Sequence, residues 1–162
     1  MKPKQKTAAL ILVCISGLVT QVQAQMAQMP ADHFMVMPKD IKWVDASPSL
    51  PPGAKAAVID GDPSKPGLFT LRLKVPAHYK VMPHYHPADE HITVLEGNCF
   101  MGVGDKLDEN SANELTTGTF GVMKAGTHHF FLSKKECIIQ LHGIGPWGIT
   151  YINPADDPRN KK

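Results

Sequence analysis

The stretch from His84 to Gly97 constrains the fold more than any other part of the 162-residue chain. His84 and His86 are separated by one residue, and Glu90 follows four positions after His86. Alternate side chains of a β-strand point to the same face, so the two histidines are predicted to point into one cavity. Two imidazoles and a carboxylate that converge are donors that suit a divalent transition metal. We therefore predict a metal site here.

A turn and a second strand follow the two histidines. Residues 87–89, Pro-Ala-Asp, have the composition of a turn. Residues 90–95 then alternate, which puts Glu90, Ile92 and Val94 on one face of a strand. The carboxylate of Glu90 is thus expected to reach the cavity from a neighbouring strand.

The first 24 residues have the organisation of a secretory signal peptide. Three lysines precede an apolar run over residues 8–19, and residues 22–24, Val-Gln-Ala, supply small residues at the cleavage positions. The run is too short to cross a bilayer of roughly 30 Å, so a retained anchor is disfavoured. We predict cleavage after Ala24 and a periplasmic or secreted protein.

Removal of this leader changes the sign of the net charge. The leader carries three of the 17 basic residues and none of the 15 acidic ones, so 14 basic and 15 acidic residues remain. The formal net charge changes from +2 for the whole chain to −1 for the remainder. The apparent basicity belongs to the leader, so no nucleic-acid partner is expected. After cleavage no membrane partner is expected either.

The remaining chain is long enough for one domain with a hydrophobic core. We predict an N-terminal arm at residues 25–46, the domain at residues 47–154 and a polar tail at residues 155–162. The arm contains four methionines, and thioethers are copper ligands. It lacks His or Cys at ligand spacing, so apolar packing on the domain or on a second subunit is favoured.

Short apolar runs separated by turn signals predict an all-β domain. Residues 68–75 alternate with Phe69 and Leu71 on one face and Thr70 and Arg72 on the other, which is typical of a half-buried strand. Further strands are predicted at residues 56–59, 99–103, 119–123, 128–132, 137–142 and 149–152, with a loop at 104–115 and a bend at 143–148. No segment after the leader has a sustained helical period. This pattern predicts a small β-barrel or sandwich.

Two cysteines, Cys99 and Cys137, lie in apolar runs of the predicted domain. In an oxidising compartment they could form a disulfide. A buried free cysteine instead behaves as a small hydrophobic residue. We favour free thiols and leave the pairing open.

Over about residues 78–133 the chain resembles the cupin superfamily, in particular the small single-domain bacterial cupins with an RmlC-like jelly roll. Seven positions are in register with the two cupin motifs: His84, His86, Glu90, Gly97, Gly118, Gly126 and His129. Three positions depart from the motifs: His78, Lys124 and Ser133. These three are turn or strand-end positions, so they bear on loop geometry more than on metal binding.

The resemblance implies a single-domain cupin β-barrel, or double-stranded β-helix, of two antiparallel sheets. Such proteins are usually dimeric, so a homodimer is expected. The resemblance also implies one metal ion held by four residues: His84, His86, Glu90 and His129. His128 faces away from its neighbour in a strand, and the motif register favours His129 as the ligand.

The remaining polar residues of interest lie elsewhere. His33 and His78 are predicted to be solvent histidines. Gln140 and His142 share one face of the predicted strand 137–142. Two interpretations of that pair stay open: they line the cavity behind the ligands or against a substrate, or they are a satisfied polar pair at the sheet edge.

The predicted donor set suits Fe, Mn, Ni, Co or Zn as the divalent metal. Four protein ligands on an octahedral ion leave two positions for water, substrate or O₂, which permits Lewis-acid catalysis or O₂ activation at Fe(II). A tetrahedral zinc would be filled and structural. We therefore favour an exported mononuclear metalloenzyme acting on a small organic molecule, with oxygenase chemistry ahead of isomerase or decarboxylase chemistry. The alternative is a non-catalytic metal- or ligand-binding cupin.

Overall fold

The computed structural model describes residues 33–161. The predicted signal peptide and the first residues of the predicted arm lie outside this range. Within it, no helix combines the length and the apolar character needed to cross a membrane.

The described residues form eleven strands and three short 3₁₀ helices. The strands are β1 (Val44–Asp45), β2 (Lys55–Gly61), β3 (Gly67–Val75), β4 (Lys80–Tyr85), β5 (Glu90–Glu96), β6 (Asn98–Val103), β7 (Asn113–Thr116), β8 (Phe120–Met123), β9 (His129–Leu132), β10 (Cys137–Gly145) and β11 (Thr150–Tyr151). The 3₁₀ helices are η1 (Pro38–Asp40), η2 (Pro154–Asp156) and η3 (Pro158–Asn160).

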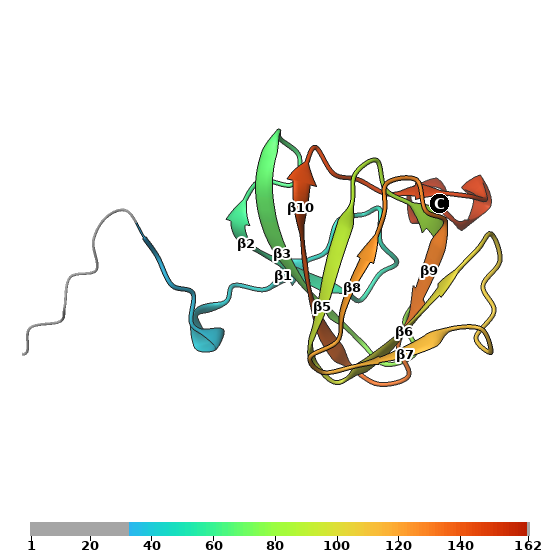
Figure 1. The fold of residues 1–162 in the computed structure, drawn as a ribbon, viewed down its shortest axis with the longest axis horizontal. Coiled ribbons are helices and arrows are strands. Elements are labelled where there is room, and N and C mark those ends of the chain that lie inside the picture. Colours follow the sequence, from blue (N-terminus) through green and yellow to red (C-terminus); the bar gives the residue numbers. More distant parts are fainter. Residues whose placement is uncertain (1–32, 162) are drawn as a thin grey trace, which may run out of the picture. The chain divides into compact units, whose positions relative to one another are not determined.

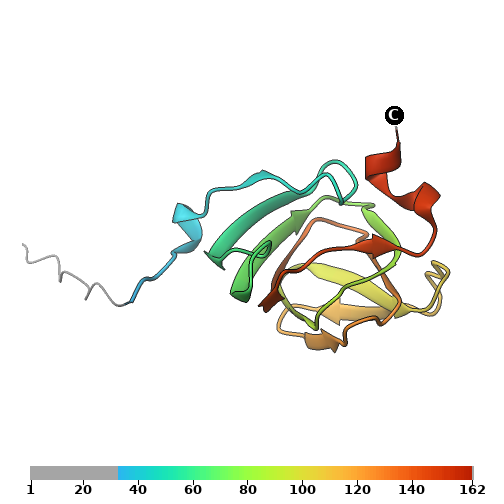
Figure 2. The same cartoon turned by 90° about the horizontal axis from the view of Figure 1, so that it is seen from above.

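The strands build two antiparallel sheets that face each other (Figure 1, Figure 2). Sheet A has the order β1-β2-β3-β10-β5-β8, and sheet B has the order β11-β4-β9-β6-β7. Strands far apart in sequence are therefore neighbours: β10 lies between β3 and β5, and β9 lies between β4 and β6. This arrangement confirms the predicted all-β jelly roll of two antiparallel sheets.

Alternation of side chains explains which strand faces point inward. In β5 the buried residues are Glu90, Ile92 and Val94, the set that the sequence period puts on one face. In β10 residues 137, 139 and 141 are buried and the residues between them are half-buried. Cys99 and Cys137 are both free and buried in this core.

Three strands depart from the predicted ranges. β1 lies within the predicted arm, β7 begins inside the predicted loop 104–115, and β10 continues to Gly145 through part of the predicted bend. Glycine explains the last difference. A Cβ on Gly143 would lie 2.8 Å from the carbonyl oxygen of Asp89, so the missing side chain lets the backbones approach closely and the ladder continue.

The three departures from the cupin motifs have structural counterparts. His78 has a positive φ of 60°, the left-handed region that favours the glycine of the motif. Lys124 forms an ion pair with Asp89 at 2.8 Å, which ties the two motif turns together. Ser133 is buried and donates a hydrogen bond to the carbonyl of Pro76 at 2.6 Å. The turns are thus held by other contacts.

We expect Gly102→Ala to destabilise the domain. Gly102 lies in β6 opposite Phe130 of β9, and an added Cβ would overlap the fully buried Phe130 ring. Overpacking of this kind costs about 1–3 kcal/mol. Gly121→Ala is the control, because its Cβ would lie 3.4 Å from the nearest atom, an ordinary contact. Thermal melting of both variants checks this, and equal melting temperatures would contradict it.

Candidate metal site

Four buried polar side chains gather at one end of the space between the sheets. His84 lies in β4 and His86 just beyond its end, while Glu90 begins β5 and His129 begins β9. Their exposed fractions are 4%, 3%, 6% and 1%, respectively. The pairing of β4 with β9 puts His84 directly opposite His129. Glu90 comes from the other sheet, so both sheets contribute to the site.

The three histidines form a group that could hold a metal ion. One ring nitrogen from each of His84, His86 and His129 lies within 4.8 Å of the other two. Glu90 lies beside two of these rings: its Oε1 is 3.6 Å from Nε2 of His86, and its Oε2 is 3.3 Å from Nε2 of His129. The structure thus brings all four predicted ligands together, with Glu90 next to the trio. Their role as ligands stays a prediction.

The ring orientation of each histidine is fixed by its second nitrogen. His84 Nδ1 lies 2.7 Å from the carbonyl of residue 82, His86 Nδ1 lies 2.6 Å from that of residue 148, and His129 Nδ1 lies 2.9 Å from that of residue 127. A carbonyl can only accept a hydrogen bond, so each Nδ1 must carry the proton. In a neutral imidazole Nε2 then keeps its lone pair, the form that binds metals.

The ring nitrogens and carboxylate oxygens that face each other favour a bound cation. Nε2 of His86 and Oε2 of Glu90 are buried and have no hydrogen-bond partner. With Nδ1 protonated, Nε2 of His129 is an acceptor that faces a carboxylate oxygen at 3.3 Å. Two buried acceptors that face each other are unfavourable unless a positive charge lies between them. These residues therefore fit a divalent metal ion.

Burial keeps the imidazoles of His84 and His86 in the neutral form that metal binding requires. Removal from water lowers the pKa of His84 to about 2, and the neighbouring His129 and His86 add to the effect. The pKa of His86 is lowered as well, again mainly by burial, although Glu90 opposes the shift. A protonated ring here would compete with a metal, so the low pKa values favour binding.

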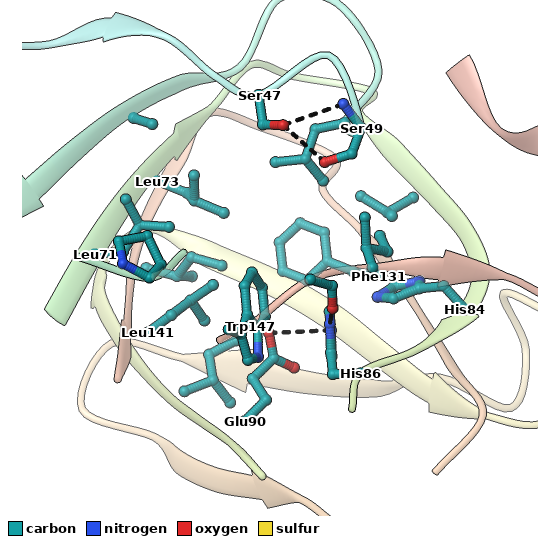
Figure 3. Close-up of a pocket in the computed structure, with 18 of the residues that line it drawn as sticks. Ser47, Ser49, Leu71, Leu73, His84, His86, Glu90, Phe131, Leu141 and Trp147 are labelled. Atoms are coloured by element: carbon teal, nitrogen blue, oxygen red, sulfur yellow. Dashed lines mark hydrogen bonds and ion pairs between the residues drawn. The ribbon is translucent and has the colours of Figure 1, made fainter. Parts of the chain in front are cut away.

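The site opens into an apolar cavity of about 350 Å³ between the sheets (Figure 3). Apolar side chains from both sheets form most of its wall: Leu50, Ala56, Val58, Pro63, Leu71, Leu73, Val75, Val81, Ile92, Met101, Phe131, Ile139, Leu141, Trp147 and Ile149. Serines 47, 49 and 64 and Tyr79 also line it. A pocket of this size and character is typical of small-molecule sites.

Trp147 is a site residue that sequence reasoning missed. Its indole stacks on the His86 ring at 4.2 Å between centroids with an interplanar angle of 19°. It follows the cis Gly145–Pro146 bond in the segment that was expected to be a simple bend. A large aromatic residue inside a glycine-rich turn was the one available signal.

The structure contradicts the interpretation that Gln140 and His142 line the cavity. In β10 their neighbours Ile139 and Leu141 point inward, so the pair occupies the outer face of sheet A. Gln140 accepts a hydrogen bond from Arg72 Nε at 2.9 Å. His142 lies against His91, 5.0 Å between ring centroids. Both residues thus lie on the outer face of the sheet, where Gln140 is hydrogen-bonded and His142 packs against another ring, which is close to the second interpretation.

The other histidines also lie away from the cavity. His33 and His78 are exposed. His128 stacks on Tyr85 and its Nδ1 is 2.6 Å from Asp105 Oδ1. Of the two neighbours, His129 lines the cavity and His128 does not, and the choice of His129 as the ligand stays a prediction.

Comparison with protein families gives one match. The model of the family described as "Domain of unknown function (DUF4437)" matches residues 27–147. No curated protein matches the chain.

Solved structures with the same fold share little sequence with this chain. The polyketide cyclase RemF from Streptomyces resistomycificus is 18% identical with a TM-score of 0.64, covering 78% of this chain and 89% of that one. A putative acetylacetone dioxygenase from Methylibium petroleiphilum PM1 is 16% identical with a TM-score of 0.59, covering 78% and 85%. An RmlC-like cupin from Shewanella frigidimarina NCIMB 400 is 13% identical with a TM-score of 0.53, covering 69% and 90%. These likenesses confirm the cupin fold.

We expect the metal-free protein to lose stability as the pH falls below the ordinary histidine pKa of 6.5. Between that value and about 2, His84 is protonated in the unfolded chain but not in the folded one. The free energy of unfolding therefore falls with decreasing pH, by about 1.4 kcal/mol per pH unit for this one group. His84→Phe removes this titratable group. The free energy of unfolding of the variant should therefore change less steeply with pH, by about 1.4 kcal/mol per pH unit.

Urea unfolding with chelator present, from pH 7 to pH 4.5, measures this slope. Phe131→Leu is the control, because it truncates a wall of the same cavity without removing a titratable group. It should keep the wild-type slope at a lower stability. Parallel slopes for wild type and His84→Phe would contradict the neutral buried state of His84.

Proposed function

Because the chain belongs to the family described as a domain of unknown function (DUF4437), a description that assigns no activity, we propose its function from the site. We propose that it is a mononuclear metalloenzyme of the cupin type that acts on a small organic molecule. The observation that carries this proposal is the convergence of three buried, Nδ1-protonated imidazoles and Glu90 at the end of an apolar cavity.

The proposed metal ligands are His84, His86, His129 and Glu90. Nitrogen and carboxylate donors suit Fe, Mn, Ni, Co or Zn, and the donors do not select among them. When bound, such an ion would supply Lewis-acid polarisation of a substrate oxygen or, if it is iron, activation of O₂. The chain itself holds the ligands in place through backbone carbonyls and surrounds the reacting centre with apolar walls that exclude water.

The lining of the cavity favours chemistry centred on the metal. Apart from the four proposed ligands, the one titratable side chain on the described cavity wall is Tyr79. Its hydroxyl donates a hydrogen bond to the carbonyl of Pro51, and burial raises its pKa well above the ordinary value. Isomerisation or decarboxylation that needs a separate acid or base is therefore less supported than oxygenase chemistry. The solved structure described as a putative acetylacetone dioxygenase has this fold, which supports that order.

The same observation supports the alternative, a non-catalytic cupin that binds a metal or a small ligand. A site that binds without reacting needs no acid or base beside the ion. Zinc held by four protein ligands would be coordinatively filled and would suit this role. Metal identity and ligand exchange therefore separate the two functions.

We also propose export and a homodimer. The leader pattern supports export to the periplasm or medium. Leu68 and Ile144 support a dimer, because they are opposite each other on the outer face of sheet A and are 72% and 55% exposed.

Expression of the full chain in a bacterium checks both export and the dimer. We expect a periplasmic protein that begins at residue 25 and sediments as a dimer, and a cytoplasmic full-length monomer would contradict both.

We expect the purified protein to hold about one Fe, Mn, Ni or Co ion per chain. Removal of two of the four ligands by His84→Ala/His86→Ala should abolish this content, because the remaining pair is too few donors to retain the ion. Elemental analysis of protein purified without chelator measures the stoichiometry. His128→Ala is the matched control, since that neighbouring histidine lies outside the cavity and should keep the full metal content.

Each outcome of the metal analysis bears on the proposed enzyme, on the non-catalytic alternative, or on both. No bound metal, and none taken up on titration, would contradict the enzyme and any metal-binding role, and would leave only a non-catalytic cupin that binds a small ligand. Zinc at one per chain that a chelator removes only on unfolding would favour the non-catalytic alternative. An exchangeable Fe, Mn, Ni or Co ion would support the enzyme and would justify a search for oxygen uptake with candidate substrates.

A further inference from the structure

The charge of the cavity wall restricts what the site can take. Among residues 33–161 no lysine or arginine lines the cavity, and its one carboxylate is Glu90. An anionic group deep in this space would lose its hydration and find no cationic side chain in exchange. The part of a ligand that lies beyond the metal end must therefore be uncharged.

The size and polarity of the wall restrict the ligand further. A volume of about 350 Å³ equals that of on the order of a dozen water molecules at ~30 Å³ each. Leu71, Leu73, Phe131 and Leu141 surround the middle of the cavity (Figure 3). Ser47 and Ser49 lie on one side of it and hydrogen-bond to each other at 2.9 Å. This wall suits a compact apolar body and offers few partners to a polyhydroxylated one.

Trp147 adds one specific donor beside the proposed metal. Its ring is held between His86, 4.2 Å away, and Phe69, 5.7 Å away, both measured between centroids. Its backbone N–H donates to the carbonyl of Pro63 at 2.7 Å, which fixes the segment. The indole Nε1 is nevertheless buried without a hydrogen-bond partner. An indole N–H can only donate, so this atom lacks an acceptor.

The proposed metal accounts for the other two unpartnered buried atoms, Nε2 of His86 and Oε2 of Glu90. It cannot account for Nε1 of Trp147, because a cation does not accept a hydrogen bond. A buried unpaired donor is costly, and such atoms are found where a ligand completes the bond. A ligand oxygen in the cavity, next to His86, would satisfy it.

We propose that the cavity binds an uncharged, mainly apolar molecule of roughly ten to a dozen heavy atoms that chelates the metal through two oxygens and accepts a hydrogen bond from Trp147 Nε1. The size follows from the cavity volume at typical pocket filling. This inference rests on the proposed metal site and adds to it the substrate class and a residue that determines specificity. It excludes phosphorylated compounds, dicarboxylates and sugars as the preferred ligands.

The test uses two ligands with the same chelating group, one of which carries a carboxylate on the far side of its ring. 2′-Hydroxyacetophenone and 3-acetyl-4-hydroxybenzoate both chelate through a phenol oxygen and a ketone oxygen. The carboxylate of the second lies opposite the phenol, in the part of the ligand beyond the metal end. The phenol proton leaves on chelation in both, so the two complexes differ by one unit of negative charge. Each ligand is titrated into the Co(II)-loaded full chain, and the visible absorption of the cobalt reports binding. We expect 2′-hydroxyacetophenone to bind at least tenfold more tightly than 3-acetyl-4-hydroxybenzoate.

Two variants test the two parts of the proposal separately. Trp147→Phe keeps an aromatic ring on His86 but removes the N–H. The affinity for 2′-hydroxyacetophenone should therefore fall about fivefold, the contribution of one hydrogen bond. Val58→Arg places a cation at a lining position that is 54% exposed, so the fold should tolerate it. This variant should narrow or reverse the preference for the uncharged ligand.

The cobalt content of each protein separates the failure of this proposal from failure of the metal site. If wild-type protein takes up no Co(II), the metal site itself fails. If it takes up Co(II) but binds 3-acetyl-4-hydroxybenzoate as well as or better than 2′-hydroxyacetophenone, or binds neither, the proposed ligand class is overturned. Unchanged affinity in Trp147→Phe would overturn the role of Trp147.

Discussion

The site depends on three hydrogen bonds from imidazole Nδ1 atoms to backbone carbonyls. The acceptors belong to Met82 within β4, Thr127 just before β9, and Gly148 just after β10. Each bond fixes both the ring orientation and the position of the proton. A rotated ring would lose its hydrogen bond to the carbonyl, which is unfavourable. The direction of the three Nε2 lone pairs is therefore set by the path of the backbone in three separate segments.

The fold also brings the four side chains together and connects the turns that carry them. Pairing of β4 with β9 brings His84 and His129 together within one sheet, while Glu90 arrives from β5 of the other sheet. A metal ion held by all four would connect the two sheets. The turns that carry the motif are tied to each other as well, because the N–H of Gly126 donates to the carbonyl of His86 at 2.9 Å. An ion bound only by the folded form would stabilise it, so metal binding would be coupled to closure of the barrel.

Much of this could be predicted from sequence because it depends on local periodicity. A period of two is enough to put His84 with His86, and Glu90 with Ile92, on inward faces. The choice of His129 over His128 needed the spacing of a known motif, since both lie next to the same turn. These predictions involve one strand at a time, where the chain itself carries the signal.

The wrong or missing predictions involve contacts between distant segments. Gln140 and His142 share a face, but sequence does not say which face of β10 meets the other sheet. The apolar identity of Ile139 and Leu141 was the signal that the odd-numbered positions point inward. Trp147 reaches the site because Gly145 lets the chain pass close to the loop at Lys65, where a Cβ would meet the carbonyl oxygen. No local period reports such a long-range approach.

The polar end and the apolar wall of the cavity differ in how they respond to substitutions. Its wall is made of inward positions such as Leu73 and Ile139, the same positions that form the hydrophobic core. A substitution there alters both the ligand and the packing of the sheets. The metal-binding end is instead held by backbone carbonyls, which no side-chain substitution removes. The shape of the cavity thus depends on core packing, whereas the orientation of the histidines depends on the backbone path of β4 and of the segments next to β9 and β10.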